Sequence, residues 1–425
     1  MIFRFRLSDA LYWLVPFMGI YTVSLFYVDS ISFFLKPPEL AAIFLIALAY
    51  PSLVRSRVSK RSVVFVLCIL LPLLVSLLVN VFSPVCIDVW SIDISTRVGE
   101  GSSRYINNSC GVTSRNITQS LYLIMGLAVF LVCSNVPLDA EKLKKSLRVS
   151  IFIAVLVSVF QAVAWYSGYY ELYLNTVYNS HPYVEQNLLY KTYGAYKRIN
   201  GAFAEPSAFG YFLALTLVMY WVIAKQEASR DVLFYSAIVV GILSTSSTFL
   251  VMMMVFLMCH VWGKRYVFWP LLFACILILM YFFDNNLALF LEVKLPSYNE
   301  RLYYALIQPY ENFIKSPMVG VAFGTDRPLS GFIAILLGFG ILGSIPILAL
   351  FYFGLRRQDL RLFLLVCAAG WITIPDFHYM FFWVYLGALL GFSNRKYSNA
   401  FEFIELRSSR YNASGRPMSE KVVAD

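Results

Sequence analysis

A ten-residue segment holds the residues whose types and spacing are best able to do chemistry. It covers 198–207, reads RINGAFAEPS and stands directly before a long apolar run. Pro206 favours the first position of a helix, and Glu205 before it suits the positive end of a helix dipole. Gly201 allows the preceding chain to turn tightly. Arg198 beside a helix N-terminus predicts an anion site, and a capped helix with an Arg198–Glu205 ion pair is the alternative.

Arg301 and His378 are candidates for the same chemistry in other polar stretches. Arg301 would give an anion a second permanently charged contact, unless it forms a loop salt bridge with Glu300 or Glu311. His378 lies close to Asp376 in a short turn and is a candidate base, with packing at the membrane interface as the alternative.

Tyrosines crowd the sequence before the ten-residue segment. Flat amphipathic rings stack on sugars while their hydroxyl groups bind polar atoms, so the tyrosines nearest the segment are candidates for substrate binding. They are Tyr190, Tyr193 and Tyr196. The tyrosines from Tyr166 to Tyr173 fit the aromatic belt of a membrane interface.

Two cysteines, Cys86 and Cys110, are the only ones of seven that we place outside the apolar runs. They can pair as a disulfide in an oxidising compartment. Asn107 and Asn116 each begin a match to the glycosylation acceptor sequence, which has meaning only in a host that glycosylates.

The elements that must position these residues follow from the composition. The chain of 425 residues is 60% hydrophobic and only 14% charged, with a mean hydropathy of +0.69. These values exclude a disordered chain, a coiled coil, a collagen-like fibre and a disulfide-stapled secreted module. We therefore expect an all-α fold, a polytopic integral membrane protein of about 12 transmembrane helices. The expected spans are 10–28, 39–54, 62–82, 118–134, 149–168, 206–224, 232–245, 248–262, 266–283, 329–354, 362–375 and 378–392.

The distribution of basic residues predicts the orientation of these spans. Most of the 34 Lys and Arg residues fall in alternate loops, which places both termini in the cytoplasm. We expect one transmembrane domain over 1–395 and a cytoplasmic tail over 396–425. The net charge of +10 then reflects topology and anionic lipid headgroups, and nucleic acid binding is not expected.

Three loops on the outer side are long, and they cover 83–117, 169–205 and 284–328. Long loops in compact proteins are usually functional, so we expect the chemistry to face outward. The sequence has no recognisable zinc-ligand spacing and no GxxxxGK nucleotide loop, so neither metal nor cofactor is expected. A literal GxGxxG match at 338–343 lies within an expected span, where close helix packing explains its glycines best.

The ten-residue segment, RxxGxxxEPS, resembles the motif of Wzy-type polymerases in the O-antigen ligase and polymerase superfamily. The serine-rich stretch 244–248 looks like the turn that follows it in these proteins, although an arginine often found there is missing. The stretches 297–301 and 316–324 resemble parts of their large outer loop. Ligases usually carry a histidine after that loop, and 327–332 has none, which favours a polymerase.

This resemblance implies a GT-C-like membrane glycosyltransferase at the periplasmic face of a bacterial inner membrane. Such an enzyme joins undecaprenyl-pyrophosphate-linked oligosaccharide repeat units into O-antigen or a related polysaccharide, with a chain-length regulator as a possible partner. Arg198 and Arg301 would neutralise the pyrophosphate leaving group, and Glu205 would act as the base. The remaining candidates would contact substrate: Gly201, Ser207, Tyr190, Tyr193, Tyr196 and His378. The alternatives are an O-antigen ligase and a non-enzymatic flippase or transporter of lipid-linked glycans.

Overall fold

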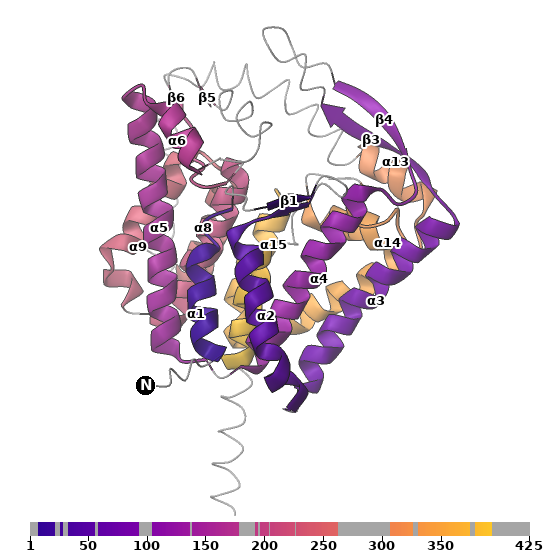
Figure 1. The fold of residues 1–425 in the computed structure, drawn as a ribbon, viewed down its shortest axis with the longest axis horizontal. Helices are drawn as coiled ribbons and strands as arrows, with labels where there is room; N and C mark the ends of the chain where they lie inside the picture. Colours follow the sequence, from indigo (N-terminus) through magenta and orange to yellow (C-terminus); the bar gives the residue numbers. More distant parts are fainter. Residues whose placement is uncertain are drawn as a thin grey trace, which may run out of the picture.

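Helices make up most of the described chain in the structure, which is a computed structural model (Figure 1). It describes residues 7–21, 26–28, 33–55, 58–92, 104–136, 138–177, 192–193, 196–203, 205–225, 227–261, 307–325, 330–374 and 379–392. The helices of the first half are α1 (Leu7–Phe17), α2 (Pro37–Arg55), α3 (Lys60–Phe82), α4 (Ser114–Asn135), α5 (Ala140–Tyr166) and the short α6 (Tyr170–Val177). Those of the second half are α8 (Pro206–Ala224), η2 (Ala228–Arg230), α9 (Val232–Leu243), α10 (Ser247–Val261), α13 (Gln308–Lys315), α14 (Gly331–Leu355), α15 (Gln358–Trp371) and a last helix, Met380–Phe392.

Three antiparallel hairpins connect helices and qualify the all-α expectation. They are β1 (Phe26–Val28) with β2 (Phe33–Leu35), β3 (Cys86–Ile92) with β4 (Arg104–Cys110), and β5 (Thr192–Tyr193) with β6 (Tyr196–Lys197). The second and third lie at the upper end of the helices in Figure 1, and we call this the hairpin end. At the opposite end, α3, α5 and α15 begin and α4 and α14 finish. We call it the basic end, because it carries Lys60, Arg61, Arg148 and Arg357.

Among the described residues, five helices, α3, α4, α5, α8 and α14, are long and apolar enough to cross a membrane. Most of the other expected spans coincide with shorter helices, and the span 266–283 lies outside the described residues. The division of the chain between 232 and 262 into two helices is confirmed by α9 and α10. The count of twelve spans and the location of the termini stay predictions.

The expected first span, 10–28, is wrong in its second half. Helix α1 ends at Phe17, soon after Pro16, and the chain then passes through a turn into strand β1. Proline removes a backbone donor and disfavours continuation of a helix, and the β-prone residues of β1 and β2 pair instead. Hydropathy alone does not distinguish these two outcomes.

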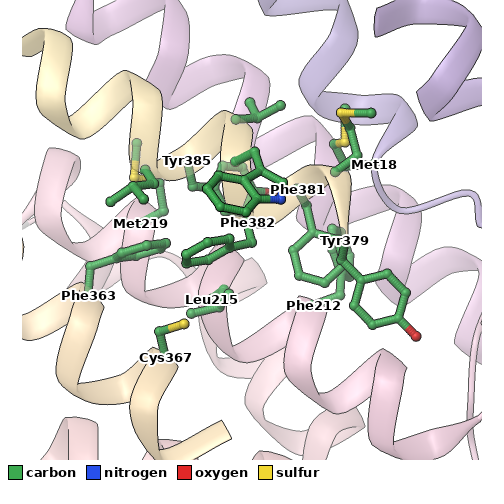
Figure 2. Packing of buried hydrophobic residues seen from close by; sticks show 14 of the residues in the cluster. Met18, Phe212, Leu215, Met219, Phe363, Cys367, Tyr379, Phe381, Phe382 and Tyr385 are labelled. Carbon is green, nitrogen blue, oxygen red and sulfur yellow. The ribbon is translucent and has the colours of Figure 1, made fainter. Parts of the chain in front are cut away.

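The core is built around α8 and the last helix. Figure 2 shows Phe212, Leu215 and Met219 of α8 packed among Phe381 and Tyr385 of the last helix. These five side chains are at most 5% exposed. α8 is apolar on every side because α5, α9, α10 and α15 pack against it.

Polar side chains within this core satisfy one another. The hydroxyl of Thr216 lies 2.9 Å from that of Tyr385. The indole of Trp371 donates to the hydroxyl of Tyr211 at 2.9 Å, and this hydroxyl also contacts the Cys367 sulfur. A polar group left without a partner in an apolar interior costs several kcal/mol, so such pairs determine how the central helices register with one another.

Helix α14 is broken at Gly340, whose backbone is not helical (φ 63°, ψ −172°). The loop Ser316–Thr325 lies against the break. The amide of Ile341 donates to the carbonyl of Pro317 at 2.9 Å, and that of Leu342 to Met318 at 3.1 Å. Irregular backbone at membrane depth requires partners of this kind.

Glycines permit the close approach at this break. A Cβ on Gly340 would lie 2.4 Å from backbone atoms of Met318, and one on Gly343 would lie 2.8 Å from Pro72 of α3. The expectation that the glycines at 338–343 serve close packing is confirmed.

Asn116 of α4 joins this loop to the helices. It is fully buried, and its side-chain oxygen accepts from the Thr113 amide at 2.8 Å. Its side-chain nitrogen donates to the carbonyl of Phe323 at 2.8 Å and to the hydroxyl of Thr325 at 2.6 Å. The match to a glycosylation acceptor at Asn116 is therefore a coincidence, because the amide serves the fold.

Candidate functional site

The segment 198–203 is a tight turn held by one side chain of α5. The side-chain oxygen of Gln161 accepts from the backbone amides of Asn200 at 2.9 Å and Gly201 at 3.1 Å. Its nitrogen donates to the side-chain oxygen of Asn200, whose own nitrogen donates to the carbonyl of Phe203. Gly201 has φ +50°, the conformation expected of a glycine in such a turn. Gln161 is fully buried, and its side-chain amide makes its hydrogen bonds with this turn.

Arg198 reaches across to the turn between α9 and α10. Its Nε donates to the Thr245 hydroxyl at 2.8 Å and to the Ser244 carbonyl at 3.4 Å, and Nη2 donates to the Thr245 carbonyl at 3.1 Å. The guanidinium is half-buried, and its orientation is set before any ligand arrives. The ten-residue segment and the serine-rich stretch 244–248 thus meet in space.

Thr245 holds an unfavourable backbone conformation at this contact. Its φ is +47°, which is unusual for a β-branched residue and costs of order 1–3 kcal/mol. The Thr245 amide donates to Ile242 at 2.9 Å, and the Ser246 amide donates to the Ser244 hydroxyl at 3.3 Å. Strain of this kind gathers at functional sites, and here it directs a hydroxyl and a carbonyl toward Arg198.

Helix α8 begins at Pro206 with Glu205 as its N-cap, as the sequence predicts. Glu205 is exposed, and its carboxylate accepts from the Ser207 hydroxyl at 3.1 Å. The amides of the first turn face the end of the helix, where the dipole favours negative charge. Arg198, Glu205 and Ser207 therefore flank one helix N-terminus at the hairpin end.

Three aromatic side chains, Trp165, Tyr170 and Tyr173, lie next to the turn and to Lys197, which precedes it. The Lys197 ammonium is buried 5.2 Å from the ring centroids of Trp165 and Tyr170, which favours the charge through cation–π contacts. Burial raises the pKa of Tyr170 to about 12, so its hydroxyl remains protonated. Tyr173 donates its hydroxyl to the Gly201 carbonyl. The backbone of Gly201 is thus bonded at both its N–H and its C=O.

Tyr21 contacts the same segment from the N-terminal side and carries a lysine on its ring. The Tyr21 amide donates to the Ala202 carbonyl at 3.1 Å, and the Tyr21 ring stacks on Phe203 at 5.6 Å. The Lys36 ammonium lies 3.6 Å from the centroid of the Tyr21 ring, and the Lys36 amide donates to buried Glu39 at 3.1 Å. Lys36 therefore lies on the Tyr21 ring and beside the carboxyl group of Glu39.

Cys86 and Cys110 lie opposite each other at the base of the β3–β4 hairpin. They are joined by a disulfide with a sulfur–sulfur distance of 2.01 Å. The bond closes the loop between α3 and α4. The hairpin lies near α13 at the hairpin end (Figure 1).

The remaining sequence-predicted site residues are placed only in part. Tyr193 and Tyr196 face each other in the β5–β6 register just before Lys197, and their side chains lie outside the described part. Tyr190, Arg301 and His378 lie outside the described residues altogether. Their proposed roles rest on the sequence.

Sequence reasoning missed Gln161, Tyr173, Lys36 and Lys197. A signal for Gln161 was present, because it is a lone amide within the apolar stretch 149–168, and polar groups inside spans are functional candidates. Tyr173 was placed in the interfacial aromatic belt, whereas the structure buries it with its hydroxyl on the Gly201 carbonyl. Lys197 adjoins the segment in sequence, and Lys36 carries no local signal.

The chain matches no protein-family model and no curated protein sequence. In the part of the chain that the structure describes, no cluster of three His, Cys, Asp or Glu residues has metal-binding geometry. Arg198 and the helix N-terminus that follows it in the chain can hold an anion, with the Glu205 carboxylate beside it.

Proposed function

We propose that this protein is a membrane glycosyltransferase, a polymerase of lipid-linked oligosaccharide repeat units. The donor is a sugar chain on undecaprenyl pyrophosphate, and the acceptor is a hydroxyl of the next lipid-linked repeat unit. The reaction takes place at the hairpin end, which we assign to the periplasmic side of the bacterial inner membrane. The product is O-antigen or a related surface polysaccharide, and a chain-length regulator is a candidate partner.

One observation carries this proposal. The guanidinium of Arg198 is oriented by Ser244 and Thr245 beside the N-terminus of α8. These residues belong to two of the four stretches that resemble the polymerase family, 198–207 and 244–248. Their meeting across 46 to 47 residues of sequence supports a shared site.

The chemistry requires charge neutralisation more than an acid. The bond between the donor sugar and pyrophosphate breaks, and the acceptor oxygen forms the new glycosidic bond. Arginine suits the departing pyrophosphate because its N–H groups give paired, permanently charged contacts. The amides at the start of α8 add donors aimed at the same charge. Glu205 accepts the proton of the acceptor hydroxyl, which is consistent with its exposure.

The break in α14 is the one described feature typical of transporters, which bind substrates at broken helices. Here the amides of Ile341 and Leu342 beyond the break are bonded to the loop Ser316–Thr325. The break is therefore filled by the chain itself. This arrangement favours the enzyme over a flippase.

An elongation assay with purified protein and a defined lipid-linked repeat unit tests the proposal. The wild type should build a ladder of products, whereas a flippase would leave the unit unelongated and a ligase would transfer it to lipid A core without making a ladder. Arg198→Lys should lose about 30- to 1000-fold in rate, since one transition-state contact to a charge is worth about 2–4 kcal/mol.

Arg148→Lys is the matched control. Arg148 pairs with Asp231 at 2.9 Å at the basic end, and a lysine preserves that ion pair. This variant should elongate like the wild type. Glu205→Gln should lower the rate if the carboxylate is the base, and should leave it unchanged if Glu205 only caps α8. Normal ladders from Arg198→Lys at normal abundance would refute the role of Arg198.

A further inference from the structure

An apolar groove of about 410 Å³ opens between helices at the basic end, far from the site described above. Its walls come from the first half of α3, the second half of α14, α15 from its start to Trp371, and the last helix, with Phe130 of α4. Val64 of α3 and Phe353 of α14 line it and are more than half exposed, so the groove opens to the surface that faces lipid. Its volume is in the range of pockets that bind small ligands.

The groove is at least as deep as one membrane leaflet. It extends along α3 from Lys60 to Ile69, a rise of about 14 Å at 1.5 Å per residue, and along α15 from Arg357 to Trp371, a rise of about 21 Å. The hydrocarbon layer of a bilayer is about 30 Å thick, so these lengths correspond to half of it or somewhat more. Phe65, Phe130 and Trp383 form the inner wall. Such a surface suits an extended hydrocarbon chain that lies parallel to the helices.

The charged side chains that the structure describes in the groove lining are all basic. They are Lys60 and Arg61 at the start of α3 and Arg357 just before α15. Both helices also begin here, so the positive ends of their dipoles face the same rim. Basic pockets between transmembrane helices are typical binding sites for anionic lipid headgroups, and guanidinium groups bind phosphate through paired contacts.

We infer that this groove binds an anionic glycerophospholipid of the leaflet at the basic end. One acyl chain lies along α3 between α14 and α15, and the phosphate contacts Lys60, Arg61 and Arg357. The lipid fills the space between α3 and the central helices and joins the α3–α4–α14 part of the molecule to the last helix. This inference does not depend on the proposed function.

Native mass spectrometry of the full-length protein in detergent tests the headgroup. Phosphatidylglycerol and the zwitterionic phosphatidylcholine, with identical acyl chains, are titrated separately into delipidated protein. We expect phosphatidylglycerol to bind at least tenfold more tightly. Replacing all three basic rim residues by Gln should weaken it about 100-fold, since each basic side chain near anionic lipid contributes a factor of about five. The matched control removes three charges elsewhere at the basic end: Lys145→Gln, Lys225→Gln and Arg230→Gln.

A second pair of variants tests the hydrocarbon chain. Leu350→Trp fills the groove, whereas Leu348→Trp places the same ring on a neighbouring exposed position of α14 outside the groove lining. Only Leu350→Trp should abolish binding, and both variants should elute as monodisperse protein. Equal binding of the two lipids, or equal loss in the two charge triples, would overturn the inference. So would a protein dimer that is lost in Leu350→Trp, because a second copy would then occupy the groove.

Discussion

Replacing Gln161 by Leu should open the turn that carries Arg198. The substitution keeps a side chain of similar size in α5 and removes the acceptor of the Asn200 and Gly201 amides, which lie at 2.9 and 3.1 Å. A buried donor left without its partner costs about 1–3 kcal/mol, so the two amides together cost about 2–6 kcal/mol. The loss falls on the turn itself, because the rest of α5 keeps its backbone bonds.

Hydrogen–deuterium exchange of a peptide covering 198–203 measures this loss directly. A cost of 2 kcal/mol corresponds to exchange about 30-fold faster than in the wild type, and larger costs to correspondingly faster exchange. The rate of elongation should also fall, since Arg198 loses its orientation when the turn opens. Gln161→Glu should be milder, because a protonated carboxyl group keeps one acceptor and one donor.

Ser150→Ala is the matched control for this prediction. Ser150 is also fully buried in α5, and it lies eleven residues before Gln161, about three turns toward the basic end. Removal of its hydroxyl should leave exchange at 198–203 unchanged. Wild-type exchange in Gln161→Leu would refute the reasoning, as would equal acceleration in the two variants.

Three further predictions concern the fold. Protein isolated without reductant should show no alkylation at Cys86 or its disulfide partner, and modification of both would exclude the disulfide. In intact spheroplasts, the cysteine of Lys145→Cys should resist an impermeant thiol reagent, whereas that of Lys315→Cys should react. The opposite pattern would mean that the helices cross the membrane in the opposite orientation. Gly340→Ala should lower the melting temperature more than Gly168→Ala: both glycines have positive φ, but a Cβ meets backbone at 2.4 Å only at Gly340 and has nothing within 4 Å at Gly168. Equal melting temperatures would contradict the packing of the broken helix.

Much of the helical framework could be predicted because its causes are local. The start of α8 at Pro206 follows from the residues themselves, since proline fits the first turn and Glu205 fits the cap. The split of α9 from α10 follows from a polar stretch in an apolar run too long for one span. The error at 10–28 arose because the residues of β1 are as apolar as those of a span, and hydropathy does not distinguish a strand from a helix.

The hydrogen-bond partners of the site residues could not be predicted in the same way. The sequence by itself determined a membrane-type composition, the positions of most helices and a segment, 198–207, poised at a helix start. Only the tertiary structure decided that Arg198 bonds to Thr245, that Gln161 holds the turn and that Gly340 breaks α14 against the loop Ser316–Thr325. The physical reason is that backbone conformation and hydropathy depend on neighbours in sequence. A buried polar group, by contrast, takes its partner from whichever helix packs against it, and that choice belongs to the whole chain.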